Sequence, residues 1–201
     1  MITPQEAKIN ICNDSDNEIL SIDVVHKYSD IKEYKTNYSV EGEYQTGMCT
    51  APMDVKYNTG FGTTGVDWWM VTWVTADGTV YITCPNNYRD IIDVLSVNGP
   101  KILDGITAFA SLFAVVGPDP VSKTAAGLVA AAAAITKSIA DPFLNEEKTE
   151  GFKMHTLRAE DANDENFIHI KNDKVIFSSP SGYSSTNIAT RLEEALMNNF
   201  K

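Results

Sequence analysis

The sequence of 201 residues lacks an excess of basic side chains. It contains 16 Lys and Arg against 27 Asp and Glu, which gives a formal net charge of −11. Nucleic-acid binding depends mainly on basic side chains that neutralise phosphates, and electrostatic docking on anionic lipid uses the same charges. The composition therefore disfavours a nucleic-acid partner and simple electrostatic binding to a membrane. Apolar residues make up 43 % of the chain, enough for an ordinary globular core.

Cysteine is scarce, and no C-x-x-C pair occurs. Cys12, Cys49 and Cys84 lie far apart along the chain. Three is the wrong count for a closed disulfide framework. The spacing predicts three reduced, partly buried thiols, with one disulfide and one remaining thiol as the alternative.

The first residues, Met-Ile-Thr-Pro-Gln-Glu-Ala-Lys, contain no basic segment followed by an apolar one. A secretory signal peptide needs both. We therefore expect a cytoplasmic protein, and a membrane-associated or released form stays open as the alternative.

The sequence also lacks linear catalytic motifs. It has no G-x-S-x-G elbow, no H-E-x-x-H pair and no P-loop, and its histidines, His26, His155 and His169, are scattered over separate predicted strands. We expect no enzyme activity, no cofactor and no metal. Carboxylates that converge only in space leave no linear signature, so an enzyme with an acidic site remains an alternative.

One stretch, Gly60 to Gly65, does match G-x-G-x-x-G. The dinucleotide fingerprint works because its glycines open a helix whose N-terminus holds the pyrophosphate. Here Asp67-Trp68-Trp69 follows, which is typical of a strand. We interpret the glycines as a wide turn that needs positive φ angles.

Alternating apolar residues predict strands at both ends of the chain. Ile22, Val24, His26 and Tyr28 share one face of an extended run. In the run that follows the glycines, Trp69, Val71, Trp73 and Thr75 take one face, and Trp68, Met70, Thr72 and Val74 take the other. Further strands are predicted at Phe152 to Arg158, Phe167 to Lys171 and Lys174 to Ser178. The pattern favours an antiparallel β-sandwich.

Helical patterns interrupt the strands. Asn87 is suited to cap a first helix, Ile102 to Val116 predicts a second, and Val121 to Ala140 a third, joined by the turn Gly117-Pro118-Asp119-Pro120. A short amphipathic helix carrying Ile188, Leu192, Ala195 and Leu196 ends the chain. The predicted fold is mainly β with a helical insert: one domain over residues 1–201, an antiparallel β-sandwich with an α-helical hairpin inserted at about 98–147. Residues 141–165 hold eight acids and three bases, which predicts a solvated connection.

The turn signal Ala76-Asp77-Gly78 predicts a hairpin, with Thr79 to Cys84 as the returning strand. Aromatic side chains are concentrated on this hairpin and at its exit. Two interpretations stay open: the rings form core, or some of them face a partner, a sugar or a lipid head group. The candidate ligand or interface residues are Trp68, Trp69, Trp73, Tyr81, Tyr88 and Arg89.

The helical hairpin has two apolar cores, Ile106 to Val116 and Ala125 to Ile135, each 11 residues long. A helix that spans a bilayer needs about 20 apolar residues, so neither core spans comfortably. We favour a hairpin buried against the sheet or a partner subunit, and keep membrane insertion after a conformational change as the alternative. The residues that decide between core and membrane are Ile106, Phe109, Leu112, Phe113 and Leu128.

Three segments resemble one known family. They are Val24 to Asp30, Val55 to Trp69 with its Thr-Gly-Phe-Gly-Thr-Thr-Gly-Val-Asp-Trp-Trp string, and Tyr81 to Arg89. These strings are similar to the "up-regulated in Daf" family of nematode and fungal proteins, over residues 8 to 95 and more loosely around Met154 to Ala159 and Val175 to Gly182. The resemblance implies a β-sandwich, a tendency to dimerise and no established enzymatic activity. By analogy, small sandwiches of this kind resemble lipid-binding aegerolysin-like and actinoporin-like proteins.

The leading hypothesis is a non-enzymatic binding or interaction module that self-associates as a homo- or hetero-oligomer, with lipid or membrane recognition left open. The first alternative is a pore-forming or toxin-like protein that deploys the hairpin 102–140. The second is the enzyme with an acidic site already described.

Overall fold

The structure is a computed structural model. It describes residues 1–29, 31–85, 88–114 and 121–190, together with Leu192, Leu196 and Asn198, and the side chains at 32, 111–114 and 121–125 fall outside this description. The predicted cap at Asn87 and the predicted turn at 117–120 also lie outside it. So do the side chains of Leu112 and Phe113, two of the hairpin candidates.

Strands occupy both ends of the chain and helices the middle, as the sequence predicts. The strands are β1 Thr3–Asn13, β2 Ile19–Tyr28, β3 Lys35–Tyr44, β4 Met53–Thr59, β5 Asp67–Thr75, β6 Val80–Thr83, β7 Lys153–Met154, β8 Glu165–Ile170, β9 Lys174–Ser179 and β10 Gly182–Ala189. The helices are α1 Tyr88–Leu95, α2 Gly99–Ala114 and α3 Val121–Asn145, and short 3₁₀ turns lie at Lys32–Tyr34, Ser96–Asn98 and Ala159–Asn163.

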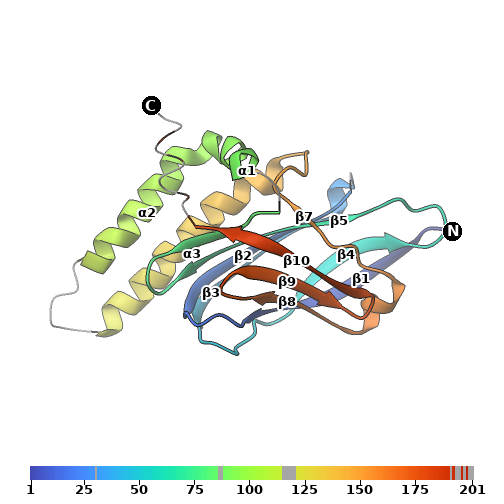
Figure 1. The fold of residues 1–201 in the computed structure, drawn as a ribbon, viewed down its shortest axis with the longest axis horizontal. Coiled ribbons are helices and arrows are strands. Elements are labelled where there is room, and N and C mark those ends of the chain that lie inside the picture. The colour runs from blue at the N-terminus through green and yellow to red at the C-terminus, as the bar shows by residue number, and fades with distance from the viewer. Residues whose placement is uncertain are drawn as a thin grey trace.

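Among the described residues the strands form one continuous ten-stranded sheet (Figure 1). Its order is β3-β2-β5-β6-β10-β9-β8-β1-β4, with β7 paired to β5. The sheet curls so that it is nearly closed, like a barrel. The mainly β class with a helical insert is confirmed. The antiparallel sandwich is not confirmed, because β6 and β10 join the two halves into one sheet and β1 pairs with β8 in parallel.

An inner core lies between the two halves of the curled sheet. The predicted faces of β2 and β5 are confirmed: Ile22, Val24 and Tyr28 point into this core together with Trp69, Val71 and Trp73. Met70 and Val74 lie on the opposite face, in a second core beneath the helices. A strand buried on both faces explains why β5 is apolar almost throughout.

Helix α3 packs on the outer face of β2, β3 and β5, and α2 packs against α3 (Figure 1). Ile135, Ile139 and Phe143 of α3 are fully buried there. Two predicted helix ends are wrong. Helix α2 begins at Gly99 and includes Pro100 in its first turn, where a missing N–H costs nothing. Helix α3 runs through Pro142 to Asn145, within its last turn.

The C-terminal third differs from the prediction in three places. Ile188 belongs to strand β10, not to a helix, although Leu192 and Leu196 beyond it are helical and buried as expected. The strand predicted at Phe152 to Arg158 shrinks to β7, and beyond it the segment contacts β5 through the His155 N–H, which donates to the Asp67 carbonyl, and through side-chain hydrogen bonds. The acidic stretch is not wholly solvated: Asp161 is fully buried.

Candidate functional site

The structure does not bring the six aromatic and basic candidates together. Trp69 and Trp73 lie in the inner core. Trp68 and Tyr88 pack against the second core beneath the helices, which we call the helix-side core. Arg89 is exposed on α1, 4.0 Å from Asp93. Trp73 and Tyr81 line one cavity together, and both are among the residues that the sequence indicates.

That cavity, which we call the end pocket, lies where β5 and β6 meet the loops that follow β1 and β8. Its volume is about 270 Å³. The residues that line it are Ser15, Asp16, Asn17, Trp73, Thr75, Tyr81, Lys171 and Asn172. Two aromatic rings among six polar side chains are a composition suited to orienting a small ligand.

The two rings form a stacked pair. Their centroids are 5.1 Å apart and their planes differ by 2°. Trp73 is buried, whereas Tyr81 is half-buried. Burial, followed by the charge of Asp77, raises the pKa of the Tyr81 hydroxyl, so the ring stays neutral at physiological pH. The pair therefore offers a flat, uncharged wall whose position is set by the core.

Hydrogen bonds join polar residues of the pocket that lie far apart in the sequence. Asn172 Nδ2 donates to Asp16 Oδ2 at 2.7 Å, and the Asp16 backbone N–H donates to Asn172 Oδ1 at 2.9 Å. Lys171 Nζ lies 3.2 Å from Asp14 Oδ2, which also contacts His169 Nδ1 at 3.0 Å. Lys171 thus faces the carboxylate of Asp14, and Asp16 adds a second carboxylate, so acidic side chains outnumber the one lysine at the rim.

A disulfide anchors the loop that carries Ser15, Asp16 and Asn17. Cys12 at the end of β1 is bonded to Cys49. The prediction of three reduced thiols is wrong, and only the alternative with one disulfide fits. The two cysteines face each other because residues 47–50 run antiparallel to the end of β1, a pairing that the spacing of 37 residues cannot indicate.

Asn13 connects this anchor to the pocket. Its backbone N–H donates to the Met48 carbonyl, and its side-chain amide donates to the Tyr44 carbonyl at 2.7 Å. The Asn13 carboxamide oxygen accepts from the Ser15 backbone N–H at 3.0 Å. The loop is thus held in one shape by contacts with a segment more than 30 residues away.

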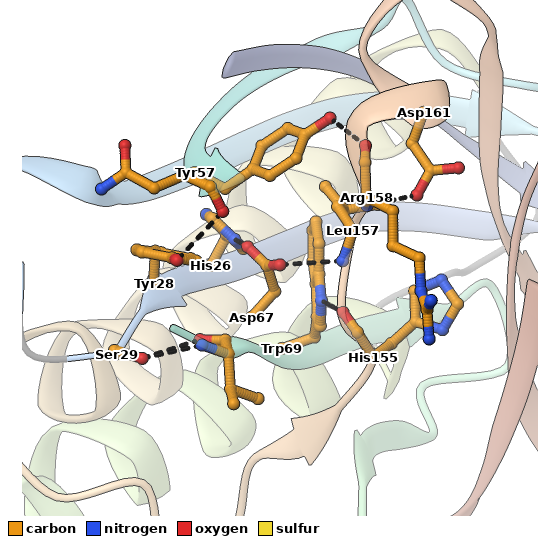
Figure 2. A network of polar contacts seen from close by, with 12 residues as sticks. His26, Tyr28, Ser29, Tyr57, Asp67, Trp69, His155, Leu157, Arg158 and Asp161 are labelled. Carbon is orange, nitrogen blue, oxygen red and sulfur yellow. Dashed lines mark hydrogen bonds and ion pairs between the residues drawn. The ribbon is translucent and has the colours of Figure 1, made fainter. Parts of the chain in front are cut away.

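A second polar cluster lies inside the curled sheet (Figure 2). His26 Nε2 and Asp67 Oδ1 are 2.8 Å apart, and both side chains are fully buried. Asp67 Oδ2 accepts from the Leu157 backbone N–H at 2.9 Å. Burial raises the pKa of Asp67, and the hydrogen bond from His26 opposes that shift.

The same cluster fixes the segment that follows β7. The Trp69 indole donates to the His155 carbonyl at 2.8 Å, and the Tyr57 hydroxyl donates to the Arg158 carbonyl at 2.8 Å (Figure 2). Asp161 accepts from the backbone N–H groups of Arg158 and Ser181. Because the His26–Asp67 pair is fully buried, we interpret it as an internal brace for the segment that follows β7.

An open groove of about 630 Å³ runs along β1. Glu6, Asp54, Asp164 and Glu165 line it together with Lys8, which pairs with Asp54 at 3.1 Å. Among the described residues no group of three or more His, Cys, Asp or Glu side chains is arranged to hold a metal ion. The groove is therefore an acidic surface with no assigned ligand.

The glycine stretch forms a turn, as predicted. Gly60 and Gly62 have φ angles of 103° and 95°, and strand β5 begins at Asp67 directly after it. Gly65 is needed for a different reason, since a Cβ at that position would lie 1.7 Å from the Tyr28 hydroxyl.

The hairpin candidates that the structure describes are part of the helix-side core. Ile106 and Phe109 are buried, and Leu128 is partly buried against the same cluster. The segment Ala126–Asn145 is nevertheless long and apolar enough to cross a membrane, and 39 % of it is buried. The buried core helix of a soluble protein meets the same criterion, so the composition of α3 alone does not distinguish core from membrane.

Comparison with known proteins identifies the family of this chain. No curated protein matches the chain. The family described as "Up-Regulated in long-lived daf-2" matches residues 3–188, a range that takes in the helical insert as well as the segments on which the resemblance was first seen. Since this match covers most of the fold, including both ends of the sheet and the hairpin, the chain belongs to the family Up-Regulated in long-lived daf-2.

Proposed function

We propose that this protein is a non-enzymatic binding module that takes a small polar ligand in the end pocket. The observation that carries the proposal is the stacked pair of Trp73 and Tyr81 beside six polar side chains in one cavity. In a ligand site, aromatic side chains supply contact area and polar groups fix the orientation of the ligand. The disulfide and Asn13 hold the polar loop in place, which lowers the entropic cost of binding.

A thermal-shift screen with sugars, nucleotides, amino acids and phosphorylated head groups tests the proposal. A ligand of the pocket raises the melting temperature of the wild type and fails to raise that of Tyr81→Ala. Asp54→Asn, in the acidic groove, is the matched control and responds as the wild type does. If no compound stabilises the wild type, or if Tyr81→Ala responds equally, the proposal is wrong.

The disulfide supports an oxidising compartment as the place where the module works. Disulfides persist in secreted and other oxidising environments and are rare in the cytosol. This proposal differs from the cytoplasmic expectation, which was based on the N-terminal residues alone. Thiol alkylation of the protein in its native cells, before lysis, tests it: a blocked Cys12–Cys49 pair supports it and two alkylated thiols contradict it.

Self-association belongs to the same proposal. Strands β3 and β4 are the two edges of the sheet, and each is hydrogen-bonded to a neighbouring strand on one side. An edge strand has backbone groups available to pair with another chain. Sedimentation velocity tests this: a dimer supports the proposal, and a monomer at high micromolar concentration contradicts it.

A second candidate function, membrane insertion of the hairpin, is favoured by one observation, the length and apolar composition of Ala126–Asn145. Opposing it, Ile135, Ile139 and Phe143 on this helix are fully buried against the sheet. Dye release from liposomes at neutral and acidic pH decides between the two. Release supports the second candidate, and its absence at both pH values excludes it.

A further inference from the structure

The end pocket has hydrogen-bonding capacity that the protein does not use. Trp73 is 1 % exposed, and within the described part of the chain its indole N–H donates no hydrogen bond. The side-chain amide of Asn17 likewise makes none within the described part of the chain. Asp16 uses one of its two carboxylate oxygens, on Asn172. Donors and acceptors are therefore both available to a ligand.

The charges of the pocket disfavour ionic ligands. Lys171, its cationic side chain, already contacts Asp14 at 3.2 Å, and Asp16 adds a second carboxylate to the rim. An anion would meet two carboxylates for one lysine. A lone carboxylate with amides is also a poor cation site, because metal ions take several anionic or oxygen ligands at once.

The size and walls of the pocket narrow the ligand further. Pockets for drug-sized ligands span roughly 300–1,000 Å³, so a volume of about 270 Å³ suits one ring-sized group. Six of the eight lining residues are polar, which disfavours a lipid tail. The half-buried ring of Tyr81, held parallel to Trp73, is part of the aromatic lining of the pocket.

We infer that the end pocket binds a neutral saccharide, taking a single sugar ring. This inference rests on the proposed binding function. A pyranose has one face of C–H groups, which packs on the negative face of an aromatic ring, and hydroxyls around its edge that both donate and accept. In the pocket the C–H face lies on Tyr81, while Asp16, Asn17 and Lys171 bind hydroxyls.

Titration calorimetry with methyl glycosides of glucose, galactose, mannose and N-acetylglucosamine tests the inference. We expect at least one glycoside to bind the wild type and to bind at least tenfold more weakly to Tyr81→Ala. Tyr81→Phe keeps the ring face and retains binding, which separates stacking from the hydroxyl. Asp16→Asn weakens binding, whereas Asp54→Asn, the same charge change in the acidic groove, leaves it unchanged. Circular dichroism of each variant confirms that it is folded.

Adenosine monophosphate and phosphocholine are titrated in parallel. If one of these binds through Tyr81 and Asp16 and no glycoside does, the saccharide inference is overturned while the proposed binding function stands. If nothing binds, or if binding is the same in the wild type, Tyr81→Ala and Asp16→Asn, both are overturned.

Discussion

The rings of Trp73 and Tyr81 lie parallel, 2° apart in orientation. Trp73 is buried in the inner core and Tyr81 is half-buried, and both line the end pocket. Their strands are paired in register, with Trp73 directly opposite Tyr81. The core therefore sets the position of the ring that a ligand would meet. This arrangement costs little entropy on binding, because the platform is already rigid.

Replacing Phe109 tests whether the hairpin is core. Phe109→Ala removes a buried ring beneath the turn at Gly78 and should lower the free energy of unfolding by about 3–5 kcal/mol. Chemical denaturation measures the change. Val97→Ala, at an 82 % exposed position, is the control and should change stability by less than about 0.5 kcal/mol. Equal stability of the two variants would contradict a hairpin buried as core.

Removing the disulfide should destabilise the fold. Cys49→Ser removes the crosslink between two residues that lie 37 positions apart. In the chain-entropy account, this loss lowers the free energy of unfolding by about 3–4 kcal/mol. Urea unfolding of Cys49→Ser against Cys84→Ser, which keeps the disulfide, measures it. Thiol titration in denaturant should count one thiol before reduction and three after. Three thiols without reductant would contradict the bond.

Replacing Lys27 should stabilise the protein, in contrast to the two substitutions above. It is 1 % exposed, its Nζ donates to the Glu146 carbonyl, and it lies 4.4 Å from the centre of the Phe152 ring. Burial, followed by the charge of Lys35, lowers the pKa of Lys27 to about 8. In the unfolded chain Lys27 keeps its proton up to a pH of about 10.5, whereas in the folded protein it loses the proton above about 8. The free energy of unfolding therefore rises with pH between 8 and 10.5. Below pH 8 the folded protein bears the full cost of burying the charge.

Lys27→Met should therefore stabilise the protein at pH 7, by about 2 kcal/mol once the lost hydrogen bond is subtracted. The advantage should shrink as the pH rises toward 10.5. Unfolding free energies at pH 7, 9 and 10.5 measure it. A variant that is less stable than the wild type at pH 7 would contradict this reasoning.

His155 should make the protein sensitive to acid. Burial lowers the pKa of His155 to about 4, although the charge of Asp161 opposes the shift. The unfolded state binds a proton from about pH 6.5 downward and the folded state does not, so stability falls as pH drops from 6.5 to 4. The loss should approach about 3 kcal/mol. The free energy of unfolding, measured between pH 4 and 6.5, should lack this loss in His155→Gln. If it falls equally with pH in the wild type and in His155→Gln, His155 does not contribute.

Much of the fold could be predicted from alternating residues, and the exceptions have physical causes. The two faces of β5 could be assigned because Trp69 and Trp73 alternate with Met70 and Val74. In β2 the alternation is broken by a bulge between Ile19 and Ser21, which no residue pattern indicates. Strand β10 was missed because its residues are mostly small and polar and only Thr186 is buried.

The candidate site was only half predictable. Trp73 and Tyr81 could be found because aromatic residues concentrate on that hairpin. The polar wall could not, since Asp16 and Asn172 lie 156 residues apart and meet only when β1 pairs with β8. The anchoring disulfide depends on the same long-range pairing of segments, which spacing along the chain does not specify.

The central claim is that the end pocket, and not the interior, receives a ligand. The three tryptophans, Trp68, Trp69 and Trp73, give three indole N–H signals in a ¹H–¹⁵N spectrum, which Trp-to-Phe variants assign. On titration with the methyl glycosides, we predict that the Trp73 signal shifts in a saturable way. The Trp69 signal, whose N–H is bonded to the His155 carbonyl, should stay in place. A Trp73 signal that does not move, or equal movement of all three, would contradict the account.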